Sequence, residues 1–347
     1  MMSLHNIRDR LEQREEDLSP FASKSKTAKR ERPEELSPMR TEYQRDRDRI
    51  VHSKAFRRLK HKTQVFIAPP GDHYVTRLTH TLEVSQVART IARALNLNED
   101  LTEAISMGHD LGHTPFGHVG EDVLNEIFPE GFRHNEQSLR VVEFLEKDGQ
   151  GLNLTREVRE GILKHSKPRE GILGENWHTS DTLEGQICKI ADSIAYVNHD
   201  IGDALRAGLI TTEDLPLMAI TVLGDSHSKR INTLVYDVID CSWSVTGSSS
   251  RDEKSTPVIS LSRAVLEAMN TLRDFLFEQV YESPSIEVES EKGREIIRSL
   301  YNYFIKYPHK LPGELLKDGA KIERAAVDHI AGMTDLYAIR TAEEVFK

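Results

Sequence analysis

The residues of this chain with the strongest chemical character lie between His109 and Glu121, where the sequence reads HDLGHTPFGHVGE. The segment holds Asp110, His113 and His118 as well, interleaved with glycines. Histidine and carboxylate side chains are costly to bury unless they are paired or bound to a metal. A polar loop that merely caps two helices would need one Asp or Ser, and not three histidines. The pattern therefore predicts a site where metal and water come close to the backbone, with His113 as a spare histidine.

The glycine-rich turn is expected to join two helices, the first ending near His109 and the second starting near Gly117. Residues three apart share a helix face, so His118 and Glu121 can act together. An imidazole exchanges protons near neutral pH because its unperturbed pKa is ~6.5. His109 and Asp110 would point about 100° apart on a regular helix, so they can share one ion only if it lies near a helix end.

Residues 77–97 carry apolar side chains at helical spacing, which predicts a strong amphipathic helix. Arg77 and His80 are three apart and hence lie on neighbouring surface of that helix. A lone histidine on a helix is more often a satisfied polar group than a ligand. His80 is a candidate only because of the cluster that follows it. A further helix is expected to begin near His134.

A second long amphipathic helix is predicted over residues 182–208. Asp192, Tyr196 and Asp200 are spaced i, i+4 and i+8, so they form a polar row along one side. A buried aspartate at residue 192 would be costly without a cation or a hydrogen-bonded partner. The alternative is that Asp192 faces water or pairs with a neighbouring lysine.

The whole pattern predicts an all-α fold. Helical periodicity dominates, whereas no alternating strand series, no βαβ pattern and no Walker-type glycine loop occurs. We expect a helical core over residues 41–215 and a C-terminal helical region, residues 216–347, packed on it. Residues 1–40 are rich in Arg, Glu, Lys and Ser, so we expect a charged arm that is partly disordered or ordered only against another subunit.

The composition limits the class of protein. The formal net charge of −10 argues against a general nucleic-acid binder. Only Cys188 and Cys241 occur, so no disulfide framework is expected, which fits a reducing cytoplasm. Because residues 1–40 are charged and lack an apolar run, we expect no signal peptide, and no run in the sequence approaches the length of a membrane-spanning helix. We therefore expect a cytoplasmic protein with no membrane partner.

The most concentrated positive charge lies in residues 45–62. Arginines there could hold phosphates through forked hydrogen bonds. The simpler interpretation, a solvated helix face, suits most of these side chains. Binding of single-stranded nucleic acid through this stretch is a secondary hypothesis, and it would require a steep salt dependence.

The order His80, His109–Asp110, Asp192 resembles the metal-binding pattern of the HD-domain phosphohydrolases. The extended motif HDLGHTPFGHVGE is more specific and is similar to the dGTPase-like branch of the deoxynucleoside triphosphate (dNTP) triphosphohydrolases. FRRLKHKTQV, RLTHTLEV and RHNEQSLR also match that branch, and the resemblance is strong over residues 43–203. It implies an HD-domain helical core with additional C-terminal helices, hydrolysis of dNTPs to a deoxynucleoside and triphosphate, and a homo-oligomer.

The resemblance also implies a metal site. Four side chains would ligate one divalent ion: His80, His109, Asp110 and Asp192. Two imidazoles and two carboxylates make a mixed site that suits Mn, Mg, Fe, Co, Ni or Zn and does not select among them. Such an ion can bind a phosphate oxygen and lower the pKa of a bound water.

Roles for the remaining site residues follow from the same resemblance. His118 and Glu121 would handle protons beside the attacked phosphorus, with His134 assisting. Other side chains would bind the substrate: Arg77 on the triphosphate, Tyr196 and Asp200 on the deoxyribose, and Gln64 near it. Some animal relatives have a lysine directly after the fourth metal ligand, where this chain has Ser193. Lys54, Arg57 or Arg58 could take over its phosphate contacts.

Two other functions remain open on the sequence. An HD phosphohydrolase acting on a nucleoside monophosphate, or on a cyclic or alarmone nucleotide, would share all four metal ligands. A regulator that binds dNTPs without catalysis would have no need for a water-activating pair. The products formed from a panel of nucleotides would separate these alternatives.

Overall fold

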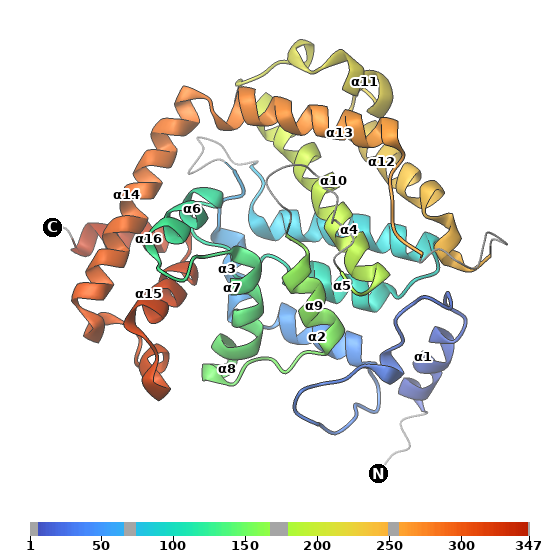
Figure 1. The fold of residues 1–347 in the computed structure, drawn as a ribbon, viewed down its shortest axis with the longest axis horizontal. Helices are drawn as coiled ribbons and strands as arrows, with labels where there is room; N and C mark the ends of the chain where they lie inside the picture. Colours follow the sequence, from blue (N-terminus) through green and yellow to red (C-terminus); the bar gives the residue numbers. More distant parts are fainter. Residues whose placement is uncertain (1–5, 66–73, 167–179, 249–256, 346–347) are drawn as a thin grey trace.

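The computed structural model describes residues 6–65, 74–166, 180–248 and 257–345 of the 347-residue chain (Figure 1). Within these ranges the chain is helical, and its β-pairing is confined to isolated bridges. This confirms the predicted all-α fold. None of the described helices is both long enough and apolar enough to span a membrane.

The central bundle surrounds the larger of two apolar clusters. Its helices are α2 (Glu42–Val51), α4 (Arg77–Ala94), α5 (Glu99–Gly108), α7 (His134–Arg140), α9 (Arg156–Lys164) and α10 (Leu183–Arg206). α10 packs along α4, while α5 lies against both α2 and α4. Side chains cap the N-termini of two of these helices. The Thr76 side chain accepts a hydrogen bond from the backbone N–H of Thr79 at the start of α4, and the Asn98 side chain accepts one from the backbone N–H of Leu101 at the start of α5.

The later helices cover the top and one side of the bundle (Figure 1). They are α11 (Leu217–Leu223), α12 (His227–Cys241), α13 (Arg263–Leu276), α14 (Pro284–Lys306), α15 (Ile322–Ala331) and α16 (Asp335–Val345). α14 packs against α6 (His118–Ile127), α15 and α16 around the second apolar cluster. The helix that begins at His118 is therefore held by the C-terminal helices.

Short helices and single turns complete the chain. The short helices are α1 (Ile7–Glu15), α3 (Lys54–Arg58) and α8 (Glu146–Gly149). The 3₁₀ turns are Ser25–Thr27, Leu59–His61, Thr212–Asp214, Trp243–Thr246, Pro308–Lys310 and Gly313–Gly319. π-helical turns follow α7 at Val141–Leu145 and α13 at Phe277–Tyr281.

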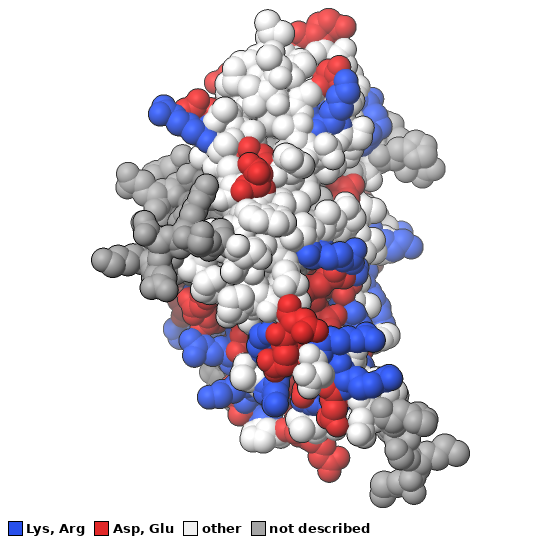
Figure 2. All heavy atoms as spheres, turned by 90° about the vertical axis from the view of Figure 1, so that its right-hand side faces the viewer, with Lys and Arg blue, Asp and Glu red and all other residues white. Residues whose placement is uncertain are grey.

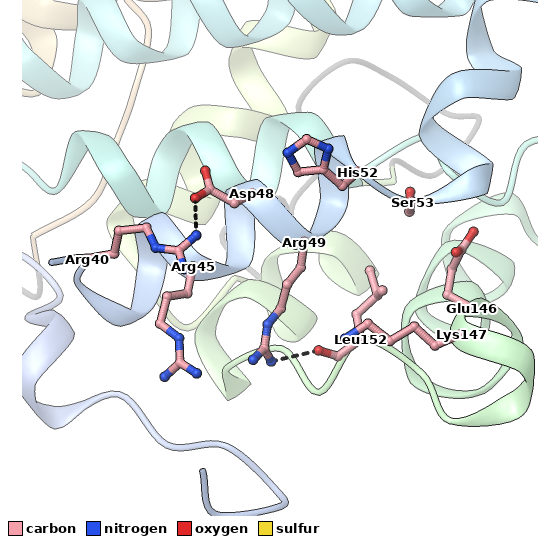
Figure 3. Close-up of a pocket in the computed structure, with 9 residues that line it drawn as sticks. All are labelled: Arg40, Arg45, Asp48, Arg49, His52, Ser53, Glu146, Lys147 and Leu152. Atoms are coloured by element: carbon pink, nitrogen blue, oxygen red, sulfur yellow. Dashed lines mark hydrogen bonds and ion pairs between the residues drawn. The ribbon is translucent and has the colours of Figure 1, made fainter. Parts of the chain in front are cut away.

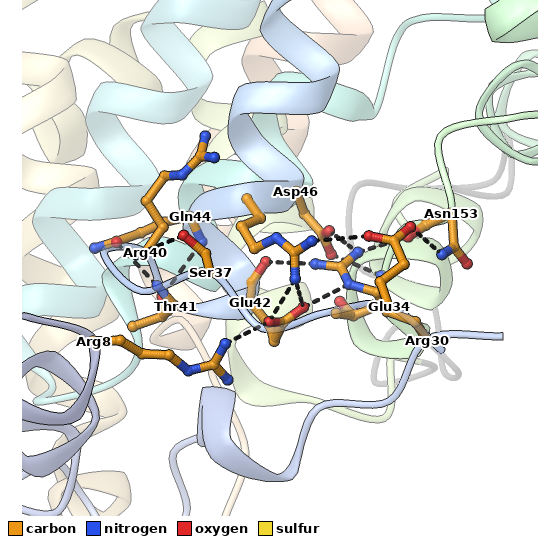
Figure 4. Close-up of polar contacts among 12 residues, drawn as sticks. Arg8, Arg30, Glu34, Ser37, Arg40, Thr41, Glu42, Gln44, Asp46 and Asn153 are labelled. Atoms are coloured by element: carbon orange, nitrogen blue, oxygen red, sulfur yellow. Dashed lines mark hydrogen bonds and ion pairs between the residues drawn. The ribbon is translucent and has the colours of Figure 1, made fainter. Parts of the chain in front are cut away.

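The composition of the N-terminal segment predicts an arm that is partly disordered or ordered only against another subunit, and residues 1–5 of that arm lie outside the described residues. Residues 6–40 carry α1, and Arg8 and Arg30 of this segment contact Glu42 on α2 of the same chain (Figure 4). Arg30 contacts Glu42 at 2.6 Å and Asp46 at 2.5 Å, and both carboxylates belong to α2. Asp46 is fully buried. The segment is ordered because its basic side chains neutralise carboxylates whose burial would otherwise be costly.

Candidate active site

The turn between α5 and α6 is shaped by two glycines. α5 ends at Gly108 and α6 begins at His118, as predicted. A Cβ on Gly112 would lie 2.1 Å from the backbone nitrogen of Ser138, so only glycine lets the turn approach α7 this closely. Gly117 has a φ of +59° at the N-terminus of α6. The glycines therefore serve close packing and chain reversal, in addition to leaving room near the histidines.

The four side chains predicted to bind metal come together inside the bundle. Ligand atoms of His80, His109 and Asp110 all lie within 4.8 Å of one another. His109 Nε2 is 3.6 Å from Asp110 Oδ1, although His109, the residue after α5, keeps helical φ and ψ angles of −60° and −40°. Asp192 Oδ1 on α10 lies 3.3 Å from His80 Nε2 on α4.

The donor set of this cluster fits a divalent ion. His109 Nδ1 lies 2.7 Å from the carbonyl oxygen of Ser106, while its buried Nε2 has no hydrogen-bond partner in the described part of the chain. Metal-ligating histidines usually donate their other N–H in this way. Burial lowers the pKa of His80 to about 4, so its imidazole is neutral, as a ligand must be. Burial would raise the pKa of Asp110, but His109 and Arg77 hold it well below its usual range.

A second cluster is built around Glu121. Its Oε2 lies 3.1 Å from His118 Nδ1, as the i, i+3 spacing predicts, and both carboxylate oxygens lie 2.9 Å from His134 Nδ1. Burial acts to raise the pKa of Glu121, but the two imidazoles outweigh it and lower that pKa strongly. The side chain of His118 is 62% exposed, so it is the histidine of this pair that a substrate can reach.

His113, which the sequence left without a role, lies in the same cluster. Its ring stacks on that of His134 with centroids 4.7 Å apart and an interplanar angle of 20°. Both its ring nitrogens are buried and lack a hydrogen-bond partner among the residues that the structure describes. Lys62 Nζ fixes the backbone here, because it donates to the carbonyl oxygens of His113 at 2.5 Å and Ala331 at 2.7 Å.

Arg77 connects the metal cluster to the turn at Gly117. Its Nη1 donates to Asp110 Oδ2 at 2.7 Å, whereas its Nε and Nη2 find no acceptor in the described ranges. The buried Oε1 of Gln64 is likewise without a donor there. A Cβ on Gly117 would lie 3.1 Å from the carbonyl oxygen of Gln64 and 3.2 Å from Arg77 Nη2. Two residues predicted to bind substrate thus meet at the start of α6.

The predicted polar row on α10 continues away from the metal cluster. Asp200 is fully buried, and it accepts a hydrogen bond from the Tyr281 hydroxyl. Its Oδ1 lies 2.7 Å from His199 Nδ1. The ring of Tyr196 lies 6.1 Å from that of Tyr281, centroid to centroid. Asp200 and Tyr196 therefore lie against Tyr281, a residue that the sequence analysis missed.

Comparison with known proteins gives two family matches. The HD domain matches residues 77–197, and the phosphohydrolase-associated domain matches residues 259–344. Three curated relatives carry the description "deoxyguanosinetriphosphate triphosphohydrolase-like protein". The first, from Caldanaerobacter subterraneus, is 54% identical over 95% of this chain and 92% of its own. The relative from Desulfatibacillum aliphaticivorans is 47% identical over 98% of this chain and 98% of its own. The relative from Clostridium perfringens is 50% identical over 91% of this chain and 90% of its own.

The chain belongs to the deoxyguanosinetriphosphate triphosphohydrolase-like (dGTPase-like) family. This confirms the resemblance drawn from the motifs. It places the chain among the HD-domain hydrolases, a class in which histidine and aspartate clusters of the kind found here hold divalent metals.

Three basic residues of this dGTPase-like protein were expected to take over the phosphate contacts that Ser193 cannot make, and each has a neighbour outside the two clusters. Lys54 Nζ lies 3.2 Å from Asp148 Oδ1, and Arg57 Nη2 donates to the carbonyl oxygen of His52 at 3.4 Å. Arg58 lies beside Gly332 at the end of α15. Phosphate contacts from Lys54, Arg57 or Arg58 stay a prediction.

A hollow of about 300 Å³ opens along α2, and its lining includes Arg40, Arg45 and Arg49 (Figure 3). These guanidinium groups are already neutralised: Arg40 contacts Asp48 at 2.7 Å, while Arg45 and Arg49 contact Glu34. The face drawn in Figure 2 likewise mixes Lys and Arg with Asp and Glu. Within the basic stretch of this dGTPase-like protein, the arginines Arg45, Arg47 and Arg49 are thus engaged in ion pairs. Binding of single-stranded nucleic acid stays a prediction.

Three further residues lie next to the predicted site residues of this family member: His165, His199 and Tyr281. His199 follows Asp192 by seven positions, about two helical turns, and that spacing could have revealed it. His165 follows α9, and its ring lies 5.0 Å from that of His109. Neither His165 nor Tyr281 carries a local sequence signal, because distant helices bring them to the site.

Proposed function

We propose that this dGTPase-like protein hydrolyses dNTPs to a deoxynucleoside and triphosphate with the help of a bound divalent ion. The observation that carries the proposal is the buried Nε2 of His109, which has no hydrogen-bond partner among the described residues and lies beside His80 and Asp110, next to the Glu121 cluster. The names of the relatives support the substrate class. Solvent exposure of His118 and burial of the metal cluster fit a site that takes its substrate from one side.

The first group of residues would bind and polarise the phosphates. An ion held by His80, His109, Asp110 and Asp192 would act as a Lewis acid on a phosphate oxygen and lower the pKa of a bound water. Arg77 would use its Nε and Nη2, which have no acceptor among the residues that the structure describes, to bind the triphosphate, over which negative charge spreads as the bond breaks. Gln64, Tyr196 and Asp200 would contact the deoxyribose.

The second group would move protons. Attack of a water oxygen on the α-phosphorus forms one P–O bond and breaks the bond to the 5′-oxygen of the nucleoside. The water loses a proton, and the leaving oxygen gains one. Because Glu121 holds Nδ1 of His118, Nε2 of that ring is left to give or take a proton. His134 assists by holding the same carboxylate.

Product analysis tests the proposal. The purified protein is incubated with Mn²⁺ or Mg²⁺ and each dNTP, and the phosphorus products are identified by ³¹P NMR. Triphosphate with free deoxynucleoside supports the proposal. Pyrophosphate or orthophosphate as the only phosphorus product would overturn it, as would turnover of monophosphates or cyclic nucleotides alone. Tight dNTP binding without hydrolysis under any divalent metal would indicate a regulator instead.

A further inference from the structure

The turn directly before the exposed histidine of the site has an unusual backbone conformation. Phe116 has a φ of +61°, in the left-handed region that residues other than glycine rarely adopt, and Gly117 follows with +59°. These angles reverse the chain just before α6 begins at His118. Among the described residues, no side chain caps the N-terminus of α6. The place of His118 therefore depends on what fixes the backbone of Phe116.

A carboxylate from the C-terminal helices contacts this backbone. Asp335 is the first residue of α16, and its Oδ1 accepts a hydrogen bond from the N–H of Phe116 at 3.1 Å. Its Oδ2 accepts from the backbone N–H of Thr63 at 2.8 Å and from the Thr63 hydroxyl. We call these contacts of Asp335 with Phe116 and Thr63 the carboxylate bridge. The bridge joins the turn before His118 to the segment that leads into Gln64.

The two bridged segments form adjoining parts of the site. Gln64, a predicted substrate residue, follows Thr63, and its carbonyl oxygen lies 3.1 Å from the position of a Cβ on Gly117. A second connection runs beside the bridge, because the buried Lys62 donates to the carbonyl oxygens of His113 and Ala331. Segment 62–64 and turn 113–117 are thus both fastened to residues 331–335, between α15 and α16.

The bridge can affect turnover because the position of a reacting group matters strongly. Misplacing such a group by ~1 Å can cost ~10²-fold in rate. A left-handed conformation at a non-glycine residue is unfavourable by itself, so it persists only where the surroundings fix it. The Phe116 side chain is buried in the second apolar cluster, which the C-terminal helices form, and its N–H is bonded to Asp335.

We propose that Asp335 is a positioning residue of the active site, whose carboxylate fixes the turn at Phe116 and thereby sets the place of His118 relative to Gln64. The proposal rests on the proposed function, in which His118 transfers protons. It gives the phosphohydrolase-associated region, which includes Asp335, a part in turnover without contact with the substrate. The competing explanation is that Asp335 only anchors α16 to the bundle.

The test variant is Asp335→Ala, which removes both acceptor oxygens of the bridge. We expect kcat to fall by ~10–10²-fold with the metal content unchanged. Asp335→Asn keeps one acceptor oxygen of the two, so its kcat should lie between those of Asp335→Ala and the wild type. Glu323→Ala is the matched control, because it removes an exposed carboxylate from the first turn of α15. Wild-type kcat in Asp335→Ala overturns the proposal.

A double-mutant cycle separates positioning from anchoring. Asp335→Ala is introduced into the wild type and into His118→Ala, and kcat is measured for all four proteins. If Asp335 acts through His118, its removal should cost little further turnover once His118 is absent. An equal fold-loss in the two backgrounds would refute the proposal, because Asp335 would then act without His118.

Amide exchange, followed by NMR, tests the bridge without any activity. We expect the N–H groups of Phe116 and Thr63 to exchange faster in Asp335→Ala than in Glu323→Ala, while the amides of α14 stay protected. Unchanged exchange at both residues overturns the bridge. Should Asp335→Ala fail to fold, Asp335→Asn must expose at least one of the two amides, and fast exchange of both in the wild type would equally refute the bridge.

The two kinds of readout also separate this proposal from the proposed function. Release of triphosphate with unchanged amide exchange removes only the positioning role of Asp335. Loss of amide protection in Asp335→Ala, in a protein whose wild type releases no triphosphate, removes the proposed activity and leaves the bridge in place.

Discussion

His80 Nδ1 lies 2.8 Å from His199 Nε2, which connects a proposed metal ligand on α4 to the polar row on α10. His199 Nδ1 lies 2.7 Å from Asp200 Oδ1, a charge contact and not an aligned hydrogen bond. The carboxylate favours a proton on that nitrogen, so His199 Nε2 can accept from His80 Nδ1. His80 Nε2 is then the atom with the free lone pair, next to Asp192.

Replacing His199 should weaken metal binding without touching a metal ligand. We expect His199→Leu to raise the dissociation constant for Mn²⁺ by ~10–100-fold, because His80 loses the group that orients it and sets its tautomer. His199→Gln should retain most of the affinity, since its amide oxygen can accept from His80 Nδ1. Isothermal titration calorimetry measures both. Equal dissociation constants for His199→Leu and the wild type would show that His80 is oriented by packing alone.

Removing the exposed histidine should separate chemistry from metal binding. We expect His118→Ala to keep the metal content of the wild type and to lower kcat by ~10²–10⁴-fold, the range typical of losing a general acid or base. His227→Ala is the matched control, because His227 is also an exposed histidine at the first position of a helix. Wild-type turnover in His118→Ala would assign proton transfer to another group.

The parts of the site that could be predicted are those encoded by local spacing. The i, i+3 pair of His118 and Glu121 follows from helix geometry, whereas the approach of His109 to Asp110 follows only from the expectation that both bind one ion near a helix end. Asp192 could be placed because the motif order of the family is distinctive. These residues lie on helices whose apolar periodicity is strong, so their faces are set before tertiary packing is known.

The parts that could not be predicted depend on contacts between distant segments. His165 and Tyr281 reach the site from the ends of α9 and α13, and no pattern near either residue indicates a partner. The N-terminal segment is a similar case. Its composition is that of a disordered arm, and it is ordered because Arg30 meets Glu42 and Asp46 on α2. Charge pairing across the fold is invisible to composition.

A side chain at residue 112 should destabilise the whole protein. In Gly112→Ala the new Cβ would lie 2.1 Å from the nitrogen of Ser138 and 2.3 Å from the carbonyl carbon of Gln137. Both atoms are backbone, so α7 itself must move. We expect a loss of ~1–3 kcal/mol or more in the free energy of unfolding, measured by urea denaturation. Gly313→Ala, whose Cβ would have nothing within 4 Å, is the control. Equal stability of the two variants would mean that the turn moves freely.

The attachment of the N-terminal segment should weaken in acid through Glu34. Partial burial acts to raise the pKa of Glu34, but hydrogen bonds from Arg49 and Asn153 outweigh it and lower the pKa from 4.5 to about 2. Because the folded-state pKa is depressed, the stabilisation is fully present above pH ~4.5 and is lost as the pH falls toward ~2. The pairs are partly exposed, so the effect on unfolding is ~1 kcal/mol or less.

Hydrogen–deuterium exchange of residues 6–40 in Glu34→Gln measures this contribution. At pH 7 we expect faster exchange of the segment in Glu34→Gln than in the wild type, because Arg49 and Asn153 lose the charged partner that holds residue 34. The difference should shrink as the pH is lowered through the window between 4.5 and about 2, where the wild-type carboxyl takes up its own proton. Glu35→Gln removes the same charge at the next position and serves as the control. The exchange rates of Glu34→Gln and the wild type could instead differ by the same amount down to pH ~2. That result would show that the segment is held by its apolar contacts and not by this carboxylate.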